Sequence, residues 1–581
     1  MTNAEIAIAL DECGTLLALR GENDFRCRAY TNAARVIDKF EGRVTDLVRE
    51  GKLAGIPGVG ETLREKITTL VTTGSLPFLD DLRAAIPAGL IAMLKLPGMG
   101  PKKVKAIHDE LQVDTIDGLK AACEDGRVAK LKGFGEKTAA KILDGIAFLG
   151  TVGNRVNICQ ALPLGERLLS QIRAMPGVTR AELCGSIRRR RETAKDIDIV
   201  AAADQAEAVM AAFTTLPEVM KVIGHGETKS SIVAKMIVNA EQVVLNADLR
   251  VVSESQFPFA VAYLTGSKEH NVRMRQRAIE RGLSLNEYGL HGQSGEVVCH
   301  SEADIYTALG LAYVPPEMRE DTGEMVAAEA KSLPKLIEPS DIKGVFHNHT
   351  TYSDGRASLE EMALAAKSLG FEYFGVGDHS QSLTIANGMN PDRVRKQWAE
   401  IDQLNAKLEG ITILKGTECD ILQDGELDYR DELLKGFDYV VASVHTHFNL
   451  PEAVQTERIC KALRHPAVTM LGHATGRLLL RRDGYKVDLD QVIRTAAEHG
   501  KMIEINAQPD RLDLDWIHVK KAKVLGVPLV INPDAHSPKE LALFVYGVHV
   551  ARRGWLTKAD VFNAKGVKEV QKELKRHKTT S

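Results

Sequence analysis

Apolar and polar residues alternate along this chain with two different periods. In residues 1–150 the apolar positions recur at the spacing of amphipathic helices. Beyond residue 150, short β-branched segments such as 242–252 alternate with helical ones, and from about residue 341 the order strand-helix-strand-helix is sustained. The pattern predicts a multidomain protein of the α and α/β classes, which ends in a parallel β/α barrel of about seven units.

One motif recurs three times in the helical region. Each copy has an apolar residue, one further residue, Gly, an apolar residue and Gly, followed by a helix; the copies are 56–60, 96–100 and 131–135. The motif resembles the helix-hairpin-helix element, whose glycines allow a tight turn that offers backbone N–H groups to a phosphate. One copy alone would indicate an ordinary helix connection, but three predict sequence-independent DNA binding. The predicted DNA-binding residues are Gly58, Gly60, Gly98, Gly100, Gly133 and Gly135.

Two carboxylates, Asp196 and Asp198, lie on one face of a strand-like segment because side chains alternate along a strand. A Gly185-Ser186 turn and four arginines, 188–191, precede them. An Asp-x-Asp alone is more often a polar strand end. Asp248, on the segment 242–252, supplies the third carboxylate that a paired-metal site needs.

These residues, together with the Tyr-Leu-Thr-Gly-Ser turn at 263–267, resemble the DNA polymerase X family. The resemblance implies a nucleotidyltransferase palm in which the three carboxylates are catalytic and hold two ions, Mg²⁺ or Mn²⁺. Leu264 stands where vertebrate members usually carry an aromatic ring, and Lys268 replaces an acidic residue. The nucleotide-binding residues that the resemblance implies are Arg155, Gly185, Ser186, Arg189, Tyr263, Gly266 and Asn271.

Lys66 falls in register with the Schiff-base lysine of family members that have deoxyribose-phosphate lyase activity. Arg26 and Thr62 illustrate that the supporting lysines of those members are not all matched here. A DNA-contacting or surface lysine is the alternative interpretation.

A second group of candidate functional residues lies in the C-terminal half, which contains most of the 17 histidines. Many polar side chains there follow strand-like segments, and in a parallel barrel the carboxyl ends of the strands share one face. A lone histidine is usually structural, but a collection at one barrel mouth predicts a metal centre. Six histidines, two aspartates and a glutamate are expected there: His347, His349, Asp354, His379, Glu418, His445, His473, Asp534 and His536.

The spacing His-x-His-x4-Asp, with the later ligands, resembles the polymerase and histidinol phosphatase (PHP) domain. The resemblance implies a distorted (β/α)7 barrel that hydrolyses phosphoesters, with these nine residues as the ligands of up to three divalent metals. Imidazole and carboxylate ligands without thiolate suit Mn²⁺, Zn²⁺ or Fe²⁺. Arg477 and Arg481, near His473, are candidate phosphate ligands.

The expected domains follow the order of these motifs along the chain. They are a helix-hairpin-helix DNA-binding domain (1–85), fingers with further helix-hairpin-helix repeats (86–150), the palm (151–255), a thumb for nucleotide selection (256–316), a linker containing a helix (317–340) and the PHP domain (341–575).

Composition and charge add limits to this scheme. The net charge of −3 gives no global cationic field, so nucleic acid must be bound by local basic surfaces. Eight cysteines without a Cys-x-x-Cys pair fit a reducing cytoplasm, and we expect nucleoid association there. No signal peptide, membrane-spanning run or heptad repeat is evident, so we expect no membrane contact and a monomer.

The leading hypothesis is a DNA-directed DNA polymerase that fills short gaps in repair by two-metal nucleotidyl transfer. Its partners would be gapped or primed DNA and deoxynucleoside triphosphates. The PHP domain would add 3′–5′ exonuclease or 3′-phosphoesterase activity that trims or unblocks 3′ ends. The alternatives are a repair nuclease whose palm is weak or mainly positions DNA, a small-molecule phosphatase and a non-catalytic DNA scaffold.

Overall fold

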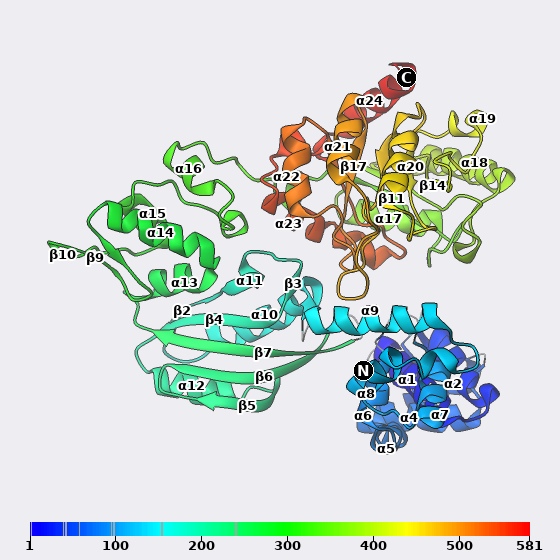
Figure 1. Cartoon of the computed structure of the whole chain (residues 1–581), viewed down its shortest axis with the longest axis horizontal. Coiled ribbons are helices and arrows are strands. Elements are labelled where there is room, and N and C mark those ends of the chain that lie inside the picture. The colour runs from blue at the N-terminus through cyan, green and yellow to red at the C-terminus, as the bar shows by residue number, and fades with distance from the viewer. Residues whose placement is uncertain are drawn as a thin grey trace. The chain divides into compact units, whose positions relative to one another are not determined.

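The protein is described by a computed structural model that covers residues 1, 3–38, 40, 43–56, 58–94, 96, 99–152, 155–238 and 241–580. The chain forms two compact units (Figure 1). One consists of Met1–Asn154 with Met236–Val243, and the other of Arg155–Lys235 with Val244–Ser581. Each unit is described by itself.

The N-terminal unit is helical, as its amphipathic pattern predicts. Apolar side chains from all of its longer helices, such as Leu10, Ile37, Ile67 and Ile107, form one core. Its helices are α1 (Asn3–Arg20), α2 (Asp24–Asp38), α3 (Val44–Arg49), α4 (Glu61–Thr73), α5 (Pro77–Ala85), α6 (Ala88–Met93), α7 (Pro101–Leu111), α8 (Ile116–Glu124) and α9 (Glu136–Val152).

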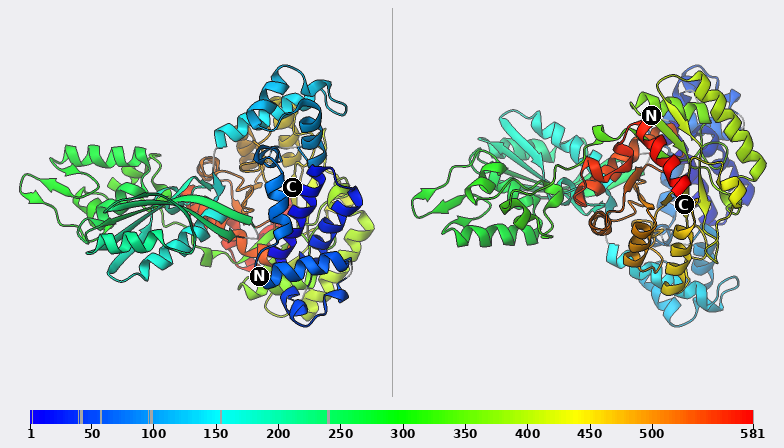
Figure 2. Two further views of the ribbon diagram at one scale, coloured as in Figure 1. Left: turned by 90° about the horizontal axis from the view of Figure 1, so that it is seen from below. Right: turned by 90° about the horizontal axis from the view of Figure 1, so that it is seen from above.

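The segment predicted to be the palm contains a five-stranded sheet in the order β2-β4-β7-β6-β5. The left view of Figure 2 shows this sheet nearly edge-on, with helices on one of its faces. Gly165 of α10 lies against Ile197 of β4, so the residues that alternate with Ile197 point to the opposite face. The elements are β1 (Val156–Asn157), α10 (Ile158–Arg173), β2 (Val178–Leu183), α11 (Gly185–Arg188), β3 (Thr193–Ala194), β4 (Asp196–Ala203), α12 (Ala206–Thr214), β5 (Val219–His225), β6 (Lys229–Val238) and β7 (Glu241–Val252).

The thumb has its own core around Phe259, Met274 and Leu309. The segment predicted as a linker contains the expected helix, but Met318 and Ala328 from this segment belong to the thumb core, so it is folded against the thumb. The elements are α13 (Phe257–Thr265), α14 (Lys268–Glu280), β8 (Ser284–Leu285), β9 (Leu290–Gly292), β10 (Gly295–Glu296), α15 (Glu302–Ala308), the 3₁₀ helix η3 (Pro316–Met318), α16 (Glu324–Glu329) and η4 (Pro339–Asp341).

The C-terminal domain is a parallel barrel, as predicted. Its strands form the orders β11-β12-β13 and β14-β15-β16-β17-β18, all parallel. Single parallel bridges, His379 to Glu418 and Asn348 to Ala535, join the two sheets at both seams. The strands are β11 (Gly344–Asn348), β12 (Tyr373–Val376), β13 (Thr412–Leu414), β14 (Gly416–Asp420), β15 (Tyr439–Ser443), β16 (Met470–Leu471), β17 (Met502–Asn506) and β18 (Leu529–Asn532).

Helices accompany the barrel strands in the order expected of β/α units. Apolar residues of the strands, such as Phe346, Tyr373 and Met502, pack with Phe562 and Leu574 into one core. The helices are α17 (Leu359–Ser368), α18 (Pro391–Lys407), α19 (Asp431–Leu434), α20 (Glu452–Arg464), α21 (Leu489–Glu498), α22 (Trp516–Val524), α23 (Phe544–Arg553) and α24 (Val567–Thr580).

One local expectation is wrong. The sequence pattern places Glu418 after a strand that ends near Gly416, whereas Glu418 is the third residue of β14. The strand is divided at Lys415, whose N–H donates to Asp438 Oδ2 at 2.8 Å instead of continuing the β12 ladder. β13 and β14 therefore occupy one barrel position, which gives the seven expected positions.

Candidate active sites

The three palm carboxylates meet at the open face of the sheet. β4 and β7 are parallel neighbours, and their register puts Asp198 directly opposite Asp248. Asp196 lies two residues before Asp198 and thus on the same face. The two strands therefore bring together the three residues that the sequence analysis selected.

The carboxylate of Asp198 is crowded. A Cβ built on Gly185, which has φ +61°, would lie 2.3 Å from Asp198 Oδ2, so a side chain at residue 185 would collide with this carboxylate. Burial, followed by the charges of Asp196 and Asp248, raises the pKa of Asp198 to about 6. Crowded carboxylates of this kind fit a cation between them.

A cationic side chain does lie beside this trio. Lys229 Nζ is 2.8 Å from Asp248 Oδ2. Carboxylate oxygens are the ligands that a hard divalent ion prefers. The trio thus supplies the ligand types of a divalent metal site, and the Lys229 ammonium balances part of its charge.

A pocket of about 440 Å³ adjoins the carboxylates. All seven predicted nucleotide-binding residues line it, together with Asp196 and Asp198. Four further cations lie in its wall; Arg191 belongs to the arginine run 188–191, and the sequence analysis gave the other three no nucleotide-binding role. These cations are Arg191, Lys195, Lys268 and Arg275.

Two of the predicted nucleotide ligands are tied to the protein itself. The Arg155 guanidinium donates to the Thr193 hydroxyl at 2.9 Å and to the Thr193 carbonyl at 2.6 Å. Arg189 donates to the carbonyl of Thr265 and to Glu320. Contact of either arginine with a triphosphate stays a prediction, and both now also have a role in shaping the pocket wall.

The turn that follows α13 is fixed from α14. The side-chain Nδ2 of Asn271 donates to the Tyr263 carbonyl at 2.7 Å, and its main-chain N–H donates to the Ser267 carbonyl at 2.9 Å. Asn271 therefore holds the Tyr263 end of the turn, and its predicted contact with the nucleotide base is not tested by this geometry.

The helix-hairpin-helix glycines lie at helix starts. Gly60 and Gly100 are the residues before α4 and α7, neither of which has a side-chain cap. Gly58 and Gly133 have φ of +78° and +84°, and a Cβ on either would meet no atom within 4 Å. Gly135 is equally open, and Gly98 lies outside the described residues. Open backbone at a helix start fits a phosphate contact.

Lys66 lies on α4, behind the first of these turns. Its Nζ is 3.4 Å from the centroid of the Phe78 ring. Burial lowers the pKa of the Lys66 amine, with a smaller opposite effect from Cys13. A lowered pKa suits an amine nucleophile, but the lyase role stays a prediction.

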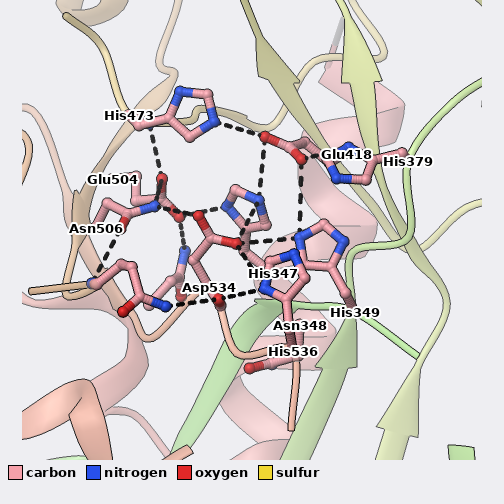
Figure 3. A network of polar contacts seen from close by, with 12 residues as sticks. His347, Asn348, His349, His379, Glu418, His473, Glu504, Asn506, Asp534 and His536 are labelled. Atoms are coloured by element: carbon pink, nitrogen blue, oxygen red, sulfur yellow. Dashed lines mark hydrogen bonds and ion pairs between the residues drawn. The ribbon is translucent and has the colours of Figure 1, made fainter. Parts of the chain in front are cut away.

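The nine predicted PHP ligands lie together at one end of the barrel. Figure 3 labels all of them except Asp354 and His445. Their ligand atoms form four overlapping groups, each within 4.8 Å, that could hold metal ions. The groups are His349, Asp354, His379 and His536; His347, His349 and Asp534; His347, Glu418 and His473; and His379, Glu418 and His445.

Five buried ring nitrogens of this cluster lack a hydrogen bond. His349 Nε2 lies 3.1 Å from Asp534 Oδ1, and His379 Nδ1 lies 2.8 Å from Glu418 Oε2, yet neither nitrogen makes a hydrogen bond. Buried polar atoms without partners are costly. Nitrogen and oxygen atoms that converge without bonding to one another are expected where both point to a shared cation.

The histidines and carboxylates of this cluster shift one another's pKa values. Burial would lower the pKa of His445, but Glu418 and Asp420 outweigh it and raise this pKa to about 10. Burial would raise the pKa of Glu418, but His347 and the neighbouring histidines hold it well below its usual range. Without metal, protons on histidine balance the carboxylates, so metal binding must release protons.

Sequence reasoning missed the residues that orient these ligands. Glu504 Oε1 lies 2.6 Å from His347 Nδ1, and Asp420 Oδ1 lies 2.5 Å from His445 Nδ1. Both carboxylates are buried. One signal was available, because Glu504 interrupts an apolar strand, Met502-Ile503-Glu504-Ile505, and a charge there needs a partner.

The arginines near His473 are arranged differently from expectation. The Arg477 guanidinium donates to the main-chain carbonyls of Arg511 and Leu512, and Arg481 pairs with Asp510 at 3.3 Å. Arg511 Nε lies 3.7 Å from Asp534 Oδ2. Arg511 thus lies next to the metal ligands, while Arg477 supports the loop that carries Arg511.

Four segments of the chain match known families. Residues 1–76 match the helix-hairpin-helix domain, 90–147 the SAM-like helix-hairpin-helix tandem, 260–320 the DNA polymerase beta thumb, and 346–508 the PHP domain. The order of these matches is the order of the predicted domains. The exact domain boundaries remain predictions.

The chain is also similar to curated proteins. It is 38% identical, over 99% of its length and 100% of that protein, to the DNA polymerase/3′-5′ exonuclease PolX of Bacillus subtilis (strain 168). It is 30% identical over 40% of its length, and 97% of the other chain, to a probable phosphatase of Thermoanaerobacter sp. (strain X514). Within the described part of the chain, no helix is long and apolar enough to cross a membrane.

Proposed function

The chain belongs to the PolX family, and from this premise we propose that it fills short gaps as a DNA-directed DNA polymerase and trims or unblocks 3′ ends as a 3′–5′ exonuclease or 3′-phosphoesterase. One observation carries the proposal: the same chain presents two separate ligand sets. The palm has three carboxylates beside a pocket. The barrel has nine converging ligands.

At the palm, Asp196, Asp198 and Asp248 would hold two ions, Mg²⁺ or Mn²⁺, which activate the attacking hydroxyl and stabilise the leaving oxygen when bound. The protein's own contribution is position. Gly185 lets the backbone approach Asp198, and the cationic wall of the pocket attracts the triphosphate. Tyr263 and Gly266 would lie along the sugar and Asn271 at the base edge.

At the barrel mouth, the ligands would hold up to three ions, of which Mn²⁺, Zn²⁺ or Fe²⁺ suit the donor set. Bound ions activate water and neutralise phosphate oxygens. Glu504 and Asp420 would fix the ring orientation of His347 and His445. Arg511 would offer a cation to the substrate phosphate.

The substrates would be gapped or primed DNA and deoxynucleoside triphosphates. The three glycine turns would hold the DNA backbone without reading its sequence. Lys66 would contact DNA or, in a deoxyribose-phosphate lyase reaction, form a Schiff base. We propose that the protein acts in the cytoplasm at the nucleoid as a monomer. Its eight free, buried cysteines fit the reducing cytoplasm.

A single substrate tests this function. The wild-type chain is incubated with a 5′-labelled primer that borders a one-nucleotide gap, with a divalent metal. With the matching deoxynucleotide the primer should gain one nucleotide, and without nucleotides it should shorten. Shortening without any extension would instead support a nuclease whose palm only positions DNA. If the primer is neither extended nor shortened, the proposal is refuted.

A further inference from the structure

Arg553, the last residue of α23 in the PHP domain, reaches the polymerase half of the same compact unit. Its side chain is 1% exposed, and its guanidinium lies over the Trp516 ring at 4.9 Å. One terminal nitrogen donates to Glu192 Oε2 at 2.7 Å and the other to Glu320 Oε1 at 3.2 Å. Glu192 precedes β3 of the palm, and Glu320 follows η3 beside the thumb.

Glu320 connects Arg553 to Arg189, a residue of the nucleotide pocket. The same Oε1 atom that accepts from Arg553 accepts from Arg189 Nε at 3.2 Å. Arg189 donates in turn to the carbonyl of Thr265, and its guanidinium nitrogen would lie 3.2 Å from a Cβ on Gly266. Arg189 and Gly266 line the pocket.

A second link runs through the neighbouring main chain. The Ser267 amide donates to the carbonyl of Arg319 at 3.1 Å, and Arg319 directly precedes Glu320. The segment at 319–320 therefore holds the Thr265 turn both by its backbone and through Arg189. Arg553 is the PHP side chain that holds Glu320.

The burial of this network makes each charge depend on the others. The four side chains are between 1% and 15% exposed. Two arginines and two glutamates balance in charge. Removing Arg553 would leave two buried carboxylates with one fewer cation, so Glu320 and then Arg189 would have to move.

We propose that Arg553 is a positioning residue of the polymerase reaction, through which the PHP domain holds the wall of the nucleotide pocket. The inference rests on the proposed function, because it assigns nucleotide binding to this pocket. It predicts that a change made in the nuclease domain, far along the chain from the palm carboxylates, weakens nucleotide binding.

The test compares Arg553→Met with Arg552→Met in the full-length chain. Arg552 is the adjacent residue of α23 and also pairs with the polymerase half, at Glu317, but it does not contact Glu320 or Arg189. Gap filling is measured as kcat and KM for the nucleotide, and equilibrium binding of a fluorescent deoxynucleotide is measured beside it. Thermal melting and the exonuclease rate are recorded for each variant.

Arg553→Met should raise the nucleotide KM and dissociation constant about fivefold or more, the scale of a typical coupling between sites. The kcat and the exonuclease rate should stay within about twofold. Arg553→Lys should restore part of the affinity, since one ammonium can serve Glu320 but not both carboxylates. Glu320→Gln should reproduce the defect and should not add to it in the double variant.

Three results would overturn the inference. They are an unchanged nucleotide KM and dissociation constant in folded Arg553→Met, an equal change in Arg552→Met, and additive effects of Arg553→Met and Glu320→Gln. If Arg553→Met does not fold, Arg553→Lys and Glu320→Gln decide by the same measurements. A wild-type chain that neither extends a primer nor binds nucleotide would instead refute the proposed function.

Discussion

Glu504 and His347 form a fully buried pair in which Glu504 Oε1 lies 2.6 Å from His347 Nδ1. The other oxygen, Oε2, accepts the amide of His473 at 2.7 Å, and Asn532 Nδ2 donates to Oε1 at 2.9 Å. With its Nδ1 proton directed to Glu504, His347 turns Nε2 toward Glu418 (Figure 3). One carboxylate thus positions two predicted metal ligands.

We expect Glu504→Gln to weaken metal binding at the barrel by about 10- to 100-fold, because the amide no longer fixes the His347 ring as a carboxylate does. The exonuclease should lose activity at limiting metal, while gap filling should be unchanged. Metal content after dialysis, measured by mass spectrometry, checks this prediction. Full metal retention would show that Glu504 is not needed for ligand orientation.

Gly266→Ala should weaken nucleotide binding. Gly266 has φ +66° and ψ −152°, a region that only glycine adopts without strain, and a Cβ would lie 3.2 Å from Arg189. The expected result is a several-fold higher nucleotide KM and about 1–3 kcal/mol of lost stability. Gly282→Ala, at φ +71° with no atom within 4 Å, is the control for strain and should leave the KM unchanged.

Gly133→Ala should reduce the affinity for gapped DNA by a similar factor for every sequence, because the turn contacts phosphates and not bases. Gly126→Ala is a matched control. Both glycines have positive φ, +84° and +78°, and neither has an atom near its Cβ position, but Gly126 lies outside the repeated motif. Equal losses of affinity in titrations at fixed salt would argue against phosphate binding by this turn.

His549 should make folding stability depend on pH. Burial, followed by the charges of Arg190 and Arg552, lowers the pKa of His549 from 6.5 to about 3. The unfolded chain therefore binds a proton that the folded chain does not. As the pH falls below about 6.5, this difference lowers the free energy of unfolding by up to about 1.4 kcal/mol per pH unit. Stability from His549 is present above that pH and is lost below it.

His549→Phe should consequently flatten the acid side of the stability curve, measured as melting temperature from pH 7.5 to 5. His549 packs edge-on against Tyr546 with ring centroids 5.7 Å apart, and phenylalanine can keep that contact. The exposed His499→Gln is the control and should leave the slope as in wild type. Parallel curves for wild type and His549→Phe would contradict the assignment.

The fold followed from the sequence where local pattern and topology agree. Strand-helix alternation after residue 341 predicts a parallel barrel, and a parallel barrel gathers strand ends, so the nine predicted PHP ligands could be expected to lie together, as they do. Asp248 could be joined to Asp198 only as a hypothesis, because the β4 to β7 register spans 50 residues and depends on the sheet order.

The orienting residues were missed for a different physical reason. Glu504 lies within a buried strand, where an alternation pattern is read as core, and its partners come from β11 and from the loop after β16. Arg553 and Glu320, which form a hydrogen bond, are 233 residues apart in sequence. Contacts across such separations leave no periodic signal in the chain.

The chain carries two separate active sites, and one cross-comparison tests this most directly. Asp198→Asn and His349→Ala are assayed on the same 5′-labelled gapped DNA, with and without the matching deoxynucleotide. The account predicts that Asp198→Asn abolishes extension and keeps trimming, whereas His349→Ala abolishes trimming and keeps extension. Loss of both activities in either folded variant would contradict it.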